Sequence, residues 1–128
     1  MSGIVLLLAA TPLLAHHSRA MYDMTRNVTY RGVVQEYRWE NPHSHVVITV
    51  APGAADPATV GTWDVEASSV NVMESGGWTR DSFKPGDAIT IVGHPMKKAS
   101  TSVLMFYVIK PDGTRLYRGQ HRYPSETE

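Results

Sequence analysis

The 128-residue sequence contains no cysteine. This absence excludes disulfide scaffolds, cysteine-based zinc sites, iron–sulfur clusters and thiol catalysis. The sequence also lacks an excess of charge of either sign, because twelve basic side chains balance twelve acidic ones. A protein that tracks nucleic acid needs a basic surface to displace counterions, so we expect no nucleic-acid partner. The same balance argues against a polybasic membrane-binding patch.

Long hydrophobic runs are rare, and the one that occurs is GIVLLLAATPLLA at residues 3–15. At about 1.5 Å per residue it is too short to cross a bilayer core of about 30 Å. It is typical of the hydrophobic region of a signal peptide. We therefore expect residues 1–15 to be removed on export, leaving no stable membrane insertion. The missing basic start and Leu13 at position −3 are atypical of such a leader, and cleavage after Ala20 is an alternative.

The rest of the chain is sufficient for one domain, with 42% hydrophobic and 19% charged residues. We expect an N-terminal arm over residues 16–27 and a β-domain over residues 28–118. A loose polar tail is expected over residues 119–128.

Short β-prone runs separated by turns predict five strands, at Val28–Trp39, His45–Ala51, Val60–Ala67, Ala88–Gly93 and Val103–Ile109. A short helix is expected at 68–76, a final ribbon at 114–117 and a bend at Gly32. Three strands, a helix and two strands is the order of the OB-fold, a five-stranded Greek-key barrel. The predicted fold class is therefore all-β and OB-like, with an SH3-like barrel or a small β-sandwich as the alternative. The residues expected in the core are Val46, Ile48, Val50, Trp63, Val65, Ile89 and Ile91.

Four motifs follow one another along the chain: HHS at 16–18, WENPH at 39–43, WDVE at 63–66 and GWTRDSFKPGD at 77–87. In this order they resemble a family of small secreted bacterial proteins, the domain-of-unknown-function family numbered 6152. The resemblance extends from about Ala15 to Tyr117. It implies a periplasmic or secreted β-domain and brings no activity with it.

Six histidines are present, and four of them form close pairs. If cleavage follows Ala15, the free amine and the ring of His16 can chelate one metal ion, and a third nitrogen would complete a histidine brace. His43 is the first candidate for this nitrogen, and the other candidate ligands are His17, His45 and His94. Nitrogen ligands without sulfur favour Cu(II). The alternative is a solvated histidine-rich start and a turn imidazole that caps a backbone carbonyl.

Two carboxylates, Asp64 and Glu66, share the polar face of the third predicted strand. A hairpin with the second strand places His45 opposite Glu66. Such a pair can orient a metal ligand or act as an acid–base pair, and an ordinary cross-strand ion pair is the alternative. The further candidates for ligand contacts are Trp39, Asn41 and Trp78.

The sequence thus predicts an exported metal-binding protein that holds copper for binding, buffering or delivery. A metal-free OB-type module that binds a small ligand, a glycan or a protein partner is the alternative. An enzyme, either a copper oxidase or a hydrolase using Glu66, ranks third.

Overall fold

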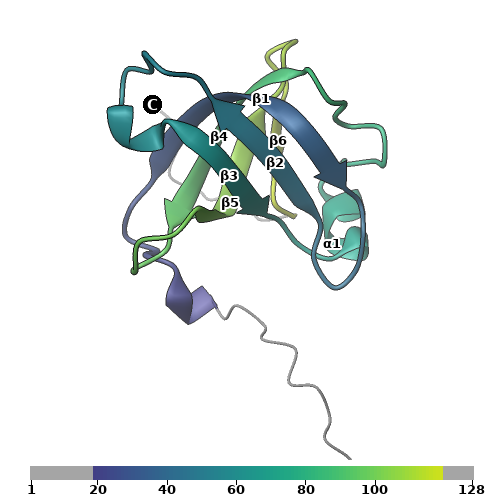
Figure 1. Ribbon diagram of the computed structural model, residues 1–128. Coiled ribbons are helices and arrows are strands. Elements are labelled where there is room, and N and C mark those ends of the chain that lie inside the picture. The colour runs from purple at the N-terminus through teal and green to yellow at the C-terminus, as the bar shows by residue number, and fades with distance from the viewer. Residues whose placement is uncertain (1–18, 120–128) are drawn as a thin grey trace, which may run out of the picture.

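The computed structural model describes residues 19–119, which form one β-barrel with short helical turns (Figure 1). None of the helices in this range is both long and apolar enough to cross a membrane. In chain order the elements are η1 (Arg19–Met21), β1 (Val28–Arg38), β2 (His45–Val50), η2 (Pro57–Thr59), β3 (Gly61–Glu66), α1 (Val70–Ser75), β4 (Ala88–Pro95), β5 (Ser102–Ile109) and β6 (Arg115–Tyr117).

The strands pair in the order β3-β2-β1-β4-β5-β6, and a parallel pairing of β3 with β5 closes the first five into a barrel. The remaining neighbours are antiparallel, and β6 extends the sheet beyond the closed barrel. The helix α1 follows β3 and lies near the β1–β2 turn, with Met73 in the core (Figure 1). The OB-like prediction is confirmed.

Alternation along the strands builds the core. Val46, Ile48 and Val50 of β2 point inward, and the exposed fraction of each is 2% or less. Val65, Ile89 and Ile91 are buried as predicted. Trp63 was expected in the core and is only half-buried: it packs against the core from one side, and its indole N–H donates to the carbonyl of Thr59 at 2.7 Å. A buried indole N–H needs such an acceptor, so the ring lies at the edge of the core, against Tyr30.

The long strand β1 changes partner midway along its length. Its first half, Val28–Val33, pairs with β4, and its second half pairs with β2 from Val33 onward. The bulge lies at Gln35, between Val34 and Glu36, and not at Gly32. Gly32 instead permits a close backbone approach, since a Cβ there would lie 2.7 Å from the carbonyl oxygen of Thr49.

We expect Gly32→Ala to destabilise the barrel by about 1–3 kcal/mol, because the added methyl group forces backbone to move away from backbone. Urea unfolding measures the effect, and Thr29→Ala on the exposed face of the same strand is the control. If the Gly32→Ala protein were as stable as this control, the backbones of β1 and β2 could move apart at Gly32 without loss of unfolding free energy.

Candidate functional site

The N-terminal segment Arg19–Asn27 lies against the ends of β4 and β5. Tyr22 forms an antiparallel bridge with Met96, and the backbone N–H of Asp23 donates to the carbonyl of Pro95 at 2.8 Å. The backbone N–H of Lys97 donates to the carbonyl of Met21 at 3.0 Å. Figure 1 shows η1 beside the β4–β5 connection. This packing buries the side chain of Tyr22 on the outside of the barrel.

Beneath Tyr22 lies the carboxylate of Glu66, on the outer face of β3. Both of its oxygens have partners: the hydroxyl of Tyr22 donates to Oε2 at 2.7 Å, and Nδ1 of His43 lies 2.6 Å from Oε1. Glu66 is only 6% exposed, although its face of the strand was expected to meet solvent. Burial, and then the hydrogen bond to Glu66, raise the pKa of Tyr22 well above its usual range. Glu66 therefore joins the N-terminal segment, β3 and the β1–β2 turn.

A second carboxylate, Asp64, makes a similar arrangement two residues earlier on β3. Nδ1 of His45 lies 2.7 Å from Oδ1, and Nη2 of Arg38 donates to Oδ2 at 3.1 Å. The hydrogen bond from His45 is the main cause that holds the pKa of Asp64 below its usual value, and Arg38 adds to it. Two histidine–carboxylate pairs thus lie side by side at this end of the β2–β3 hairpin.

The register matches the expected hairpin, because His45 is the backbone partner of Glu66. The side chains nevertheless pair diagonally: His45 meets Asp64, and His43 meets Glu66. The backbone N–H of Ala67 donates to the carbonyl of Ser44, and the N–H of Ser44 donates to the carbonyl of Ser68, each at 2.8 Å. The pairing therefore continues beyond β2, and both histidines have the same offset from their carboxylates. Diagonal neighbours across antiparallel strands lie within reach of long side chains.

The two contacts fix which nitrogen of each ring carries hydrogen. An ionised carboxylate only accepts, so Nδ1 of His43 and of His45 is the donor. A neutral imidazole in this tautomer has its lone pair on Nε2, the nitrogen that binds a metal when a carboxylate holds the other side. Within residues 19–119, no three histidine or acidic side chains gather to form a metal site. His16 and His17 lie outside the described residues.

His94 occupies a different position. Its Nδ1 lies 2.9 Å from the carbonyl oxygen of Arg26, and its ring stacks on Phe106 with 5.8 Å between centroids. A carbonyl only accepts, so Nδ1 of His94 is protonated and holds the end of the N-terminal segment. His94 borders a hollow of about 150 Å³, whereas His43 borders one of about 310 Å³. The two hollows share Arg19, Ser68, Val72 and Arg118, but within residues 19–119 His94 forms no three-residue metal cluster with His43 or His45.

The three other candidates have roles in packing and capping. Trp78 is buried in the core and donates through its indole N–H to the carbonyl of Tyr117 at 2.7 Å. Trp39 is half-buried, with its ring centroid 5.9 Å from that of Tyr37. The amide oxygen of Asn41 accepts from the backbone N–H of Val70 at 3.0 Å, which ties the β1–β2 turn to the start of α1.

Sequence reasoning missed the contributions of Tyr22 and Arg38. Tyr22 lies 44 residues from Glu66, and no spacing rule connects an N-terminal arm to the outer face of a strand. Arg38 is the last residue of β1, and the bulge at Gln35 determines on which face of the sheet its side chain lies. A tyrosine shortly after the HHS motif was the one available signal.

We expect Tyr22→Phe to destabilise the protein by about 1–3 kcal/mol, because it leaves a buried carboxylate oxygen of Glu66 without its donor. Urea unfolding gives the change in free energy. Tyr107→Phe is the matched control, since Tyr107 is half-buried and its hydroxyl makes no hydrogen bond to residues 19–119. Equal stability of the two variants would mean that the hydroxyl of Tyr22 does not hold the segment.

The pairing of Asp64 predicts a pH dependence of stability. Its folded pKa lies below the unfolded value of about 3.9, so the ionised form favours folding. This contribution is complete above the unfolded pKa and is lost as the pH falls through the folded pKa. We expect Asp64→Asn to flatten the decline of unfolding free energy between about pH 5 and pH 3. The exposed Asp81→Asn serves as the control, and identical pH profiles for both variants would contradict the pairing.

Comparison with known proteins places the chain in a family. The model of a family of unknown function (DUF6152) matches residues 5–105, more than half of the sequence. No curated protein matches the chain. The resemblance carried by the HHS, WENPH and GWTRDSFKPGD motifs agrees with this match, and the chain belongs to the DUF6152 family.

Proposed function

We propose that the protein is exported to the periplasm or medium and binds a copper ion there, through the N-terminal His16 and the imidazole of His43. The observation that carries the proposal is the chain of contacts from Tyr22 through Glu66 to His43, at 2.7 Å and 2.6 Å. It holds one imidazole in the tautomer that binds metals, at the surface against which the N-terminal segment packs.

The carboxylate of Glu66 suits a supporting role and not that of a ligand. Both of its oxygens already have partners, and its side chain is 8% exposed, against 36% for His43. Such carboxylates orient the ring of a metal-binding histidine and increase the basicity of its other nitrogen. The pair of His45 and Asp64 provides a second supported imidazole two residues along the chain.

The N-terminal histidines are within reach of this surface. Arg19 lines the same hollow of about 310 Å³ as His43 and Glu66. His16 precedes Arg19 by three residues, a distance of at most about 10 Å along an extended chain. Cleavage after Ala15 would give His16 a free amine, and this amine, the ring of His16 and the ring of His43 would make three nitrogen ligands.

The ligand chemistry selects the metal. Three nitrogen ligands without sulfur favour Cu(II) over the other divalent first-row metals. The role that follows is copper binding or delivery, without a catalytic step.

Titration of Cu(II) into protein that begins at His16 tests the proposal, with calorimetry for affinity and electron paramagnetic resonance for nitrogen coordination. We expect His16→Ala, one extra residue ahead of His16, and His43→Ala each to weaken binding at least tenfold. The extra residue removes the amine from the chelate and leaves every side chain in place. Glu66→Gln should weaken it by about 10–100-fold, as loss of a supporting carboxylate does.

His121→Ala is the control, because it removes a histidine that the proposal does not use. Unchanged copper affinity in both N-terminal variants would overturn the proposal and leave the metal-free binding module in its place. An equal loss of copper affinity in His121→Ala would mean that imidazoles bind copper non-specifically, and it would also contradict the proposal.

A further inference from the structure

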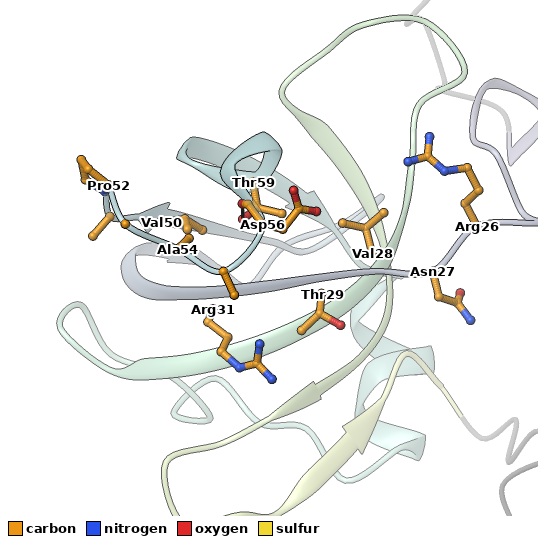
Figure 2. A pocket seen from close by; sticks show the side chains of 13 residues that line it. Arg26, Asn27, Val28, Thr29, Arg31, Val50, Pro52, Ala54, Asp56 and Thr59 are labelled. Atoms are coloured by element: carbon orange, nitrogen blue, oxygen red, sulfur yellow. Dashed lines mark hydrogen bonds between the residues drawn. The ribbon is translucent and has the colours of Figure 1, made fainter.

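A large hollow lies between the first half of β1 and the segment that follows β2 (Figure 2). It has a volume of about 790 Å³ and shares no lining residue with the hollow beside His43. Val28, Val50 and Ala54 contribute apolar surface to it. We call this hollow the β1 cleft.

One wall of the β1 cleft is a strand edge that lacks a neighbouring strand. Residues Val28–Gly32 pair with β4 on one side, whereas pairing with β2 begins only at Val33. After Val50 the chain leaves the sheet and forms the opposite wall of the cleft. Among residues 19–119, no backbone hydrogen bond joins Val28–Gly32 to that wall. Backbone groups on such an edge are a template for another strand.

The charges on the β1 cleft are mainly positive. Arg26 and Arg31 both line it and are exposed, and within the described part of the chain neither forms an ion pair. Figure 2 shows them at opposite ends of this stretch of β1. Asp56 is the one acidic residue in the lining, and its Oδ1 accepts from the backbone N–H of Ala58, where it caps η2. The rim therefore favours a ligand with negative charges.

A charged residue on an edge strand can also serve to block pairing with other chains. Arg31 alone would fit that role. Here, however, the facing loop does not cover the edge and leaves a hollow of about 790 Å³ along the strand. The open edge and the two arginines together favour recognition over protection.

We propose that an extended, acidic segment of a partner protein binds in the β1 cleft by adding a strand to β1 along Val28–Gly32. Its backbone completes the ladder, and its carboxylates pair with Arg26 and Arg31. Added strands derive affinity from backbone hydrogen bonds and specificity from alternate side chains. In an extended chain, side chains on one face recur about every 6.8 Å. A segment with acidic residues at alternate positions therefore presents carboxylates along one face, on the side of Arg31, and smaller apolar residues toward Val28 and Val50. Arg26 lies just before the start of β1, on the other side of the strand, where it can meet a carboxylate at the end of the segment.

The probe is a capped eight-residue peptide of alternating glutamate and valine, and its counterpart has lysine for glutamate. Nuclear magnetic resonance titration of the full chain reports where each peptide binds. We expect the glutamate peptide to shift the amide signals of Val28–Gly32 and to slow their hydrogen exchange. The lysine peptide should bind at least tenfold more weakly, and N-methylation of alternate backbone amides should abolish binding.

Charge reversal makes the test specific. The double variant Arg26→Glu and Arg31→Glu should lose at least tenfold in affinity for the glutamate peptide and gain affinity for the lysine peptide. The matched control is Arg80→Glu with Lys84→Glu, which changes the net charge equally at exposed positions away from the β1 cleft. It should change either affinity by less than threefold.

Equal or undetectable binding of the two peptides would overturn the proposal, as would shifts centred outside the β1 cleft or equal losses in both double variants. The chain's own C-terminal tail is another candidate occupant, and deletion of residues 120–128 tests it. A tenfold gain in peptide affinity on this deletion would mean that the chain's own tail fills the cleft, and the partner-protein proposal would then be wrong.

Discussion

A buried carboxylate is the constraint on which the candidate site depends. Glu66 is 6% exposed on the outer face of a barrel strand, and such a group is stable only when its oxygens are hydrogen-bonded. Tyr22 supplies one donor and His43 the other, from two segments that both lie more than 20 residues before Glu66 in the chain. Because both donors are needed, the N-terminal segment, the β1–β2 turn and β3 are held in one arrangement, and the ring of His43 takes a defined tautomer.

The OB-like barrel creates both surfaces through one feature, the length of β1. An eleven-residue strand bonds to β4 with its first half and to β2 with its second. The second half brings the β1–β2 turn, with His43 at its end, to the carboxylates of β3. The first half extends beyond β2 and leaves an open edge at Val28–Gly32. Gly32 lies at the change of partner, where only a residue without a side chain allows the backbone of Thr49 to approach.

Periodicity was enough to predict the barrel. The inward alternation of Val46, Ile48 and Val50 and the glycine- and proline-rich turns indicated the strands within one or two residues at most ends. Trp63 was predicted less well, because alternation gives the face of a side chain and not how much of a large ring its neighbours cover. An indole N–H that needs an acceptor is placed by the nearest carbonyl, here that of Thr59.

The candidate site was predictable only in part, for a related reason. The hairpin register followed from the positions of His45 and Glu66, which are backbone partners. The actual side-chain pairs follow from diagonal contacts and from two further residues, Tyr22 and Arg38, each of which donates to the second oxygen of one carboxylate. Contacts between segments distant in sequence leave no periodic signal, so the burial of Glu66 appears only in three dimensions.

The candidate site and the β1 cleft differ in how their charged groups are paired. Asp64 and Glu66 lie with two histidines at one end of the β2–β3 hairpin, whereas Arg26 and Arg31 border the β1 cleft. The segment Arg19–Asn27 connects the two places: Tyr22 is bound to Glu66, and the carbonyl of Arg26 is bound to Nδ1 of His94. The same short segment therefore contributes Tyr22 to the candidate site and Arg26 to the β1 cleft. Its attachment to β4 is what both surfaces have in common.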